Sequence, residues 1–241
     1  MKCVHCLGEA GNTKDHVFPK GWYPENTPLN IQRPTVPSCA TCNNSLGTME
    51  KELFIRMALC ITPDHPEAIG INSKLLRSFG LGIDEDSLSP EEIEIRRKLL
   101  KKIFSETKPY TPDIKVFPGL GLHEGFPPEL QVTTPVPFNE LEKVSKKIVR
   151  GLEYIFGGKR YIEEPYEVEV YFPEEKHGIK SLYDLLKKHG MQATYGPGFY
   201  VERAVATDKT KSVIYQIKVW NKLTIFGSVM TPDPDRDVAE K

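Results

Sequence analysis

The chain has 241 residues, 39% of them hydrophobic, and a formal net charge of −1. A chain of this length and composition can bury a sizeable core, as one large or two smaller domains. The balanced charge excludes a general positive field, so any nucleic-acid surface has to be a local patch.

Four of the five cysteines form two Cys-x-x-Cys pairs, Cys3 with Cys6 and Cys39 with Cys42. Four thiolates from two such pairs are the ligand set of a tetrahedral structural zinc. This arrangement favours a reducing, cytoplasmic location over a disulfide framework. We expect no signal peptide, because Cys3 already belongs to the motif, and no membrane partner, because no run of about 18 apolar residues occurs.

The stretch between the pairs carries the dipeptide Asp15-His16, a carboxylate suited to a hard metal beside an imidazole that can take a proton near neutral pH. Residues 14–38 are expected to form a short hairpin and a proline-rich loop. His5 lies inside the first cysteine pair, and we expect it to be a bystander because four cysteines already complete the zinc shell. Trp22 either packs the small domain or stacks on a base, and packing is the favoured interpretation.

A helix is predicted from Thr41 to about Ile61, since apolar residues recur there at helical spacing. Asn43 and Glu50 are seven residues apart and lie on one face of this helix, so Glu50 either looks into the same site or is a solvated glutamate. A hairpin followed by a helix, with zinc holding one end of each, is a treble-clef arrangement.

Taken together, residues 1–60 resemble the zinc-bound branch of the HNH endonucleases, the ββα-metal nucleases. The residues that carry the resemblance are Cys3, Cys6, Asp15, His16, Pro19, Val36, Pro37, Ser38, Cys39, Cys42, Asn43 and Asn44. The resemblance implies a nuclease domain over residues 1–62 with a chemically silent zinc.

The resemblance also implies roles for individual residues. His16 would be the general base that deprotonates water, and Asp15 would bind a divalent metal, Mg²⁺ or Mn²⁺, with Asn43 completing its shell. Asn30 is the preferred residue to orient His16, and Asn26 is the next candidate. Asn44 and Glu50 are secondary candidates.

Residues 63–133 read as a linker and helical region. A short helix is expected over residues 73–79, and a longer one from Ser89 to about Phe104, because Ser-Pro-Glu-Glu is a typical helix start. Basic residues on the longer helix either contact phosphates or form a solvated face: Arg96, Arg97, Lys98, Lys101 and Lys102. Two short strands are expected, Ile114–Phe117 and Leu130–Thr133.

Residues 134–231 are expected to form an α+β domain. Its helix would start with Asn139 as N-cap and end near Phe156, with an apolar face. A strand over Glu167–Phe172, a short helix over Leu182–His189 and an antiparallel meander would follow, the meander with strands at Phe199–Ala206, Val213–Trp220 and Leu223–Met230. Residues 232–241 read as a polar tail.

These features predict an α+β protein, a metal-dependent endonuclease acting on DNA. One alternative is a zinc-finger module that binds nucleic acid or protein without chemistry, and another is an RNase. The joint presence of Asp15, His16 and Asn43 favours the enzyme over the binding module. Since one ββα site cuts one strand, double-strand cleavage would require a homodimer or two passes.

Overall fold

A computed structural model describes residues 1–62, 64–80, 89–123, 125–173, 184, 186–207 and 212–231. These residues form several helices, a five-stranded antiparallel sheet and an N-terminal group of four cysteines, so the predicted α+β class is confirmed. None of the described helices is long and apolar enough to cross a membrane. The predicted tail, residues 232–241, lies outside the described residues.

The N-terminal part is a hairpin followed directly by a helix. Its elements are β1 (Thr13–His16), the 3-10 helix η1 (Lys20–Trp22), β2 (Thr35–Ser38) and α1 (Ala40–Ala58). The two strands pair antiparallel, with Asp15 opposite Val36. Cys39 caps α1, since its Sγ accepts a hydrogen bond from the Cys42 backbone N–H at 3.4 Å. The predicted hairpin and helix are confirmed, although α1 ends before the expected Ile61.

The middle of the chain holds two helices and a small ladder of strands. The elements are η2 (Pro66–Ala68), α2 (Ile71–Ser78), α3 (Pro90–Glu106), β3 (Lys108–Pro109), η4 (Pro128–Leu130) and β4 (Val132–Thr133). Both predicted helices are confirmed, and Ser89 and Glu92 form a reciprocal capping box at the start of α3. The strand expected at Ile114–Phe117 is wrong, because the Ile114 N–H donates to the Thr111 carbonyl and closes a turn. Of the strand expected at Leu130–Thr133, only the last two residues form a paired strand, β4.

The C-terminal part is one helix and one sheet. Its elements are α4 (Phe138–Phe156), β5 (Glu167–Tyr171), β6 (Met191–Thr194), β7 (Phe199–Val205), β8 (Val213–Val219) and β9 (Leu223–Met230). The sheet order β5-β9-β8-β7-β6 is antiparallel throughout and confirms the predicted meander. Helix α4 starts one residue before Asn139, with Pro137 as N-cap, so the predicted cap is wrong. The expected helix Leu182–His189 lies partly outside the described residues, and residues 186–189 are helical.

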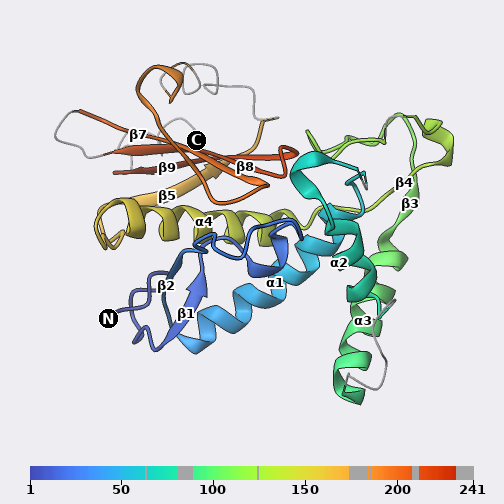
Figure 1. Cartoon of the computed structure of the whole chain (residues 1–241), viewed down its shortest axis with the longest axis horizontal. Helices are drawn as coiled ribbons and strands as arrows, with labels where there is room; N and C mark the ends of the chain where they lie inside the picture. The colour runs from blue at the N-terminus through green and yellow to red at the C-terminus, as the bar shows by residue number, and fades with distance from the viewer. Residues whose placement is uncertain are drawn as a thin grey trace, which may run out of the picture.

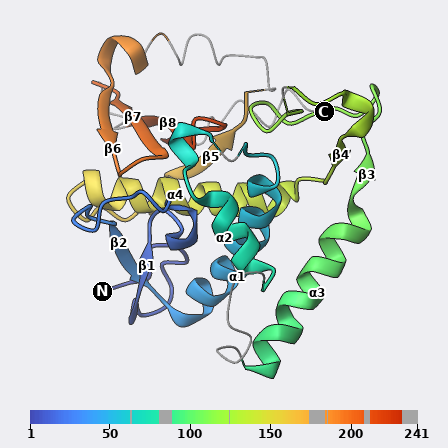
Figure 2. The same ribbon diagram turned by 45° about the vertical axis from the view of Figure 1, so that its right-hand side comes forward.

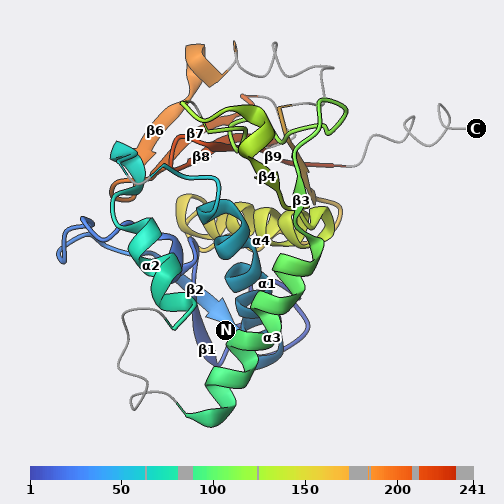
Figure 3. The same ribbon diagram turned by 90° about the vertical axis from the view of Figure 1, so that its right-hand side faces the viewer.

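Helix α4 is the layer between the sheet and the N-terminal part. In Figure 1 the sheet lies on one side of α4, and α1 with the β1–β2 hairpin lies on the other. Figures 2 and 3 show the same order from two further directions, with α3 extending away from these layers. The contacts agree, since α4 packs on β5 and β9 and also on α1 and β2. Residues of the N-terminal hairpin are therefore supported by a helix from the far half of the chain.

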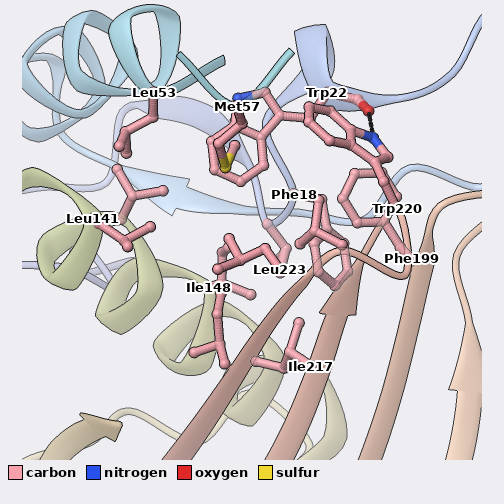
Figure 4. Packing of buried hydrophobic residues seen from close by; sticks show 14 of the residues in the cluster. Phe18, Trp22, Leu53, Met57, Leu141, Ile148, Phe199, Ile217, Trp220 and Leu223 are labelled. Carbon is pink, nitrogen blue, oxygen red and sulfur yellow. Dashed lines mark hydrogen bonds between the residues drawn. The ribbon is translucent and has the colours of Figure 1, made fainter. Parts of the chain in front are cut away.

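One continuous core joins the N-terminal part to the sheet (Figure 4). The rings of Phe18 and Phe199 lie 4.5 Å apart, and the Trp220 indole N–H donates to the Trp22 carbonyl at 2.7 Å. Trp22 is 1% exposed, which confirms the packing interpretation and excludes base stacking by this side chain. The predicted division at residues 62 and 133 stays a prediction, but the two outer parts share their buried residues.

Candidate metal centre and candidate active site

The four paired cysteines converge at the base of the N-terminal hairpin. Their sulfur atoms all lie within 4.8 Å of one another, and the Cys6 and Cys39 sulfurs are 3.9 Å apart. Zn–S bonds of about 2.3 Å place neighbouring sulfurs of a tetrahedral site about 3.8 Å apart. The donor set and its spacing therefore fit a metal ion such as zinc, held by Cys3, Cys6, Cys39 and Cys42.

The electrostatics of this group also fit a bound cation. Burial raises the pKa of Cys3, but backbone N–H groups of Cys6 and Cys39 outweigh it and lower that pKa to about 6. Burial raises the pKa of Cys42, and the thiol of Cys39 and the charge of Cys3 raise it further. Crowded thiolates repel each other, and a dication removes that repulsion. Burial lowers the pKa of Arg150 of α4, and the charge of Cys42 opposes that shift, so α4 contributes a positive side chain near the cysteines.

A buried group of charges lies beside the cysteines, under the hairpin. The Lys147 Nζ of α4 is 3.1 Å from Asp15 Oδ1 and 2.5 Å from Glu50 Oε1. The other oxygen of Asp15, Oδ2, accepts a hydrogen bond from His5 Nε2 at 2.9 Å. The side chain of Lys147 is 1% exposed and that of Asp15 7%. Glu50 therefore reaches the same site as Asp15, which was one of its two predicted roles. The cation that the two carboxylates share is the Lys147 ammonium.

The protonation tendencies of the two carboxylates differ. Burial alone would raise the pKa of Asp15, but the His5 hydrogen bond and the Lys147 charge lower it below its ordinary value. For Glu50 burial dominates and raises the pKa, although Lys147 acts in the opposite direction. Asp15 is therefore the firmly ionised partner of Lys147.

His16 faces away from this buried group. Adjacent strand residues point to opposite sides, and β1 buries Asp15 while leaving His16 half-buried. Burial lowers the pKa of His16; the charge of Asp15 opposes this shift, and three positive side chains reinforce it: Lys147, Lys20 and Arg33. The His16 Nδ1 is buried without a hydrogen-bond partner. A neutral imidazole results, with Nε2 as the nitrogen left to meet solvent.

The asparagines of the predicted site are dispersed. Asn43, in the first turn of α1, donates from Nδ2 to Thr13 Oγ1 at 3.2 Å and so ties the helix start to β1. Asn44 is exposed, and Asn30 and Asn26 are exposed in the loop between η1 and β2. Within the described contacts none of these last three residues bonds to His16 or Asp15, so their predicted roles stay predictions.

Two residues of the buried group were missed or set aside by sequence reasoning. His5 was expected to be a bystander to the metal; it lies outside the cysteine group, yet it holds Asp15. Lys147 was not singled out, although a signal existed. It lies three residues after Val144 and four before Gly151, on the apolar face of the predicted helix, where a lysine is unusual unless paired.

The basic residues of α3 mostly have neighbours of opposite charge. Arg97 and Lys98 lie 3.6 and 3.8 Å from carboxylate oxygens of Glu94, and Lys102 is 2.8 Å from Glu52. The exposed Arg97 and Lys98 pairs are what a solvated helix face provides, so that interpretation gains support, whereas Lys102 joins α3 to Glu52 of α1, whose side chain is 14% exposed. Phosphate contact by α3 stays a prediction.

Comparison of the chain with protein families, with curated proteins and with solved structures gave no match. The resemblance to HNH endonucleases therefore rests on the motif residues alone and stays a prediction.

Proposed function

We propose that this protein is an endonuclease that hydrolyses phosphodiester bonds of nucleic acid, with DNA as the favoured substrate and His16 as the general base. The observation that carries the proposal is the state of His16, a half-buried imidazole with a lowered pKa at the end of a strand anchored by four cysteines. A base must be neutral before it can take a proton, and it must be rigidly held.

Individual residues have separate roles in the proposed hydrolysis. His16 Nε2 takes a proton from the attacking water, while β1 positions the half-buried imidazole. The positive charges of Lys20 and Arg33 act on His16, so both lie near enough to attract a phosphate approaching it. Zinc at Cys3, Cys6, Cys39 and Cys42 would supply rigidity to a hairpin too small to be stable by its core alone.

The Mg²⁺ or Mn²⁺ ion implied by the resemblance does not fit the Asp15 carboxylate in this arrangement. One Asp15 oxygen accepts from His5, the other faces Lys147, and the side chain is 7% exposed. A dication about 4 Å from the Lys147 ammonium would be repelled by on the order of 8 kcal/mol at an effective dielectric constant of about 20. No step of the proposed mechanism therefore uses a metal at Asp15.

The same observation favours a second candidate, a zinc-finger module that binds nucleic acid or protein without chemistry. In such a module Asp15 would be a structural partner of Lys147 and His5, which is the only role its contacts require. The nuclease requires His16 and the binding module does not, so substitution of this residue is the experiment that separates the two.

The test is cleavage of supercoiled plasmid by zinc-loaded protein, with Mg²⁺, with Mn²⁺ and with no added divalent ion. Single-stranded DNA and RNA are run in parallel. We expect cleavage that is lost in His16→Ala and kept in His189→Ala, an exposed histidine outside the site. Absence of His16-dependent cleavage on every substrate would overturn the nuclease and leave the binding module.

A further inference from the structure

We propose that the Lys147 ammonium is the resident cation of the candidate site, occupying the position between Asp15 and Glu50 that a divalent ion would otherwise take. The proposal deepens the proposed function and rests on it in one respect, that this site is the active site. The contacts of Lys147 do not depend on the proposed function. It assigns Lys147 as a positioning residue rather than a catalytic one.

The geometry around the ammonium is that of a cation site. A single Nζ atom lies within 3.1 Å of an Asp15 oxygen and 2.5 Å of a Glu50 oxygen. Two carboxylates from different elements, one on β1 and one on α1, converge on one point. Carboxylate oxygens converging in this way also bind Mg²⁺ and Mn²⁺, so the ammonium and a divalent ion compete for the same donors.

The burial of the site favours the ammonium over a hydrated ion. The side chains of Lys147, Asp15 and Glu50 are 1%, 7% and 15% exposed. Mg²⁺ loses its waters reluctantly and keeps several of them in proteins. A largely buried position between two carboxylates therefore suits an ammonium that belongs to the protein's own side chain.

The backbone of α4 holds the ammonium in place. Val144 and Ile148, on either side of Lys147 along the helix, are fully buried. Gly151, one turn later, lies so close to the hairpin that an added Cβ would be 2.8 Å from Val17 Cγ2. Helix α4 therefore packs tightly against the hairpin at Val17 and on β2, and Lys147 cannot move away to admit another cation without moving that helix.

The test is binding of Mn²⁺ to the zinc-loaded full chain, followed by electron paramagnetic resonance of the free ion. Zinc loading fills the cysteines, so Mn²⁺ reports on the carboxylates alone. We expect wild type and Asp15→Asn to bind Mn²⁺ equally weakly, with a Kd no lower than about 1 mM in either protein. We expect Lys147→Met to gain a site at least about tenfold tighter, because it frees Asp15 and Glu50.

Two further variants sharpen the result. Lys146→Met removes the neighbouring lysine, which pairs with Glu142 on the outside of α4, and should behave as wild type. Lys147→Met combined with Glu50→Gln should lose the gained site. If Lys147→Met does not fold, the comparison of wild type with Asp15→Asn still decides.

A wild-type Mn²⁺ site in the micromolar range that disappears in Asp15→Asn would overturn the proposal, and so would folded Lys147→Met with no gain in Mn²⁺ binding. Neither result depends on cleavage. Failure of the nuclease is read from His16→Ala on plasmid, whereas failure of this inference is read from Mn²⁺ binding, so the two are distinguishable.

Discussion

Replacing Lys147 by methionine should destabilise the fold strongly, since methionine keeps the long apolar stem and removes only the ammonium. Lys147 is 1% exposed, and it lies 3.1 Å from Asp15 and 2.5 Å from Glu50, which are also largely buried. Removing one partner of a buried ion pair leaves an uncompensated charge and costs about 3–5 kcal/mol. We expect a loss in the free energy of unfolding of this size.

The assay is urea unfolding of the zinc-loaded protein, followed by circular dichroism and by tryptophan fluorescence in parallel. Lys146→Met is the matched control, because Lys146 is 31% exposed and pairs with Glu142 on the same helix. We expect the control to lose less than about 1 kcal/mol. Adding Glu50→Gln to Lys147→Met should recover about 1–2 kcal/mol, since the two sites are in contact. Equal losses in Lys147→Met and Lys146→Met would refute the reasoning.

Three other outcomes follow from the structure. Cys39→Ser should lose the bound zinc, measured by elemental analysis, and lower Tm by about 10 °C or more, and an unchanged Tm would refute the metal assignment. The pKa of His16 is lowered by burial, so the cleavage rate should be flat from pH of about 6.5 upward and should fall only at more acidic pH, where His16 protonates. The same shift makes unfolding easier as pH falls below the ordinary histidine value of about 6.5, and a cleavage rate still rising at high pH would contradict the role of His16. Gly151→Val should cost about 2 kcal/mol by forcing Val17 aside, whereas Gly47→Ala, with open space around its Cβ, should stabilise α1 by about 1 kcal/mol in the same unfolding assay.

Features with a local cause were predictable from the sequence. The Cys-x-x-Cys spacing placed the four sulfurs, since a tight turn brings residues three apart to one point. The capping box at Ser89 fixed the start of α3, because both hydrogen bonds join residues within one turn. The meander followed from alternation and turn residues, and it is confirmed from Phe199 to Met230.

The wrong and missed secondary-structure predictions arose where tertiary contacts or a turn overrode the local sequence pattern. Residues 114–117 read as a strand, but a turn closed by Thr111 breaks the extension, and Phe117 packs instead on Phe138 and Phe172. Strand β6 was missed, because its short polar sequence becomes a strand only through pairing with β7. Edge pairing of this kind is decided by the neighbouring strand.

The sequence alone indicated that a metal-binding cysteine group would flank the hairpin that carries the Asp-His pair, because these residues are close along the chain and their spacing is set by turns and strands. Only the tertiary structure decided what each residue meets. Lys147 reaches Asp15 because α4 packs between the sheet and the hairpin, and that packing depends on a core shared by both halves of the chain. Contacts between distant segments depend on how whole faces fit together, so no local pattern could assign the cation that Asp15 binds.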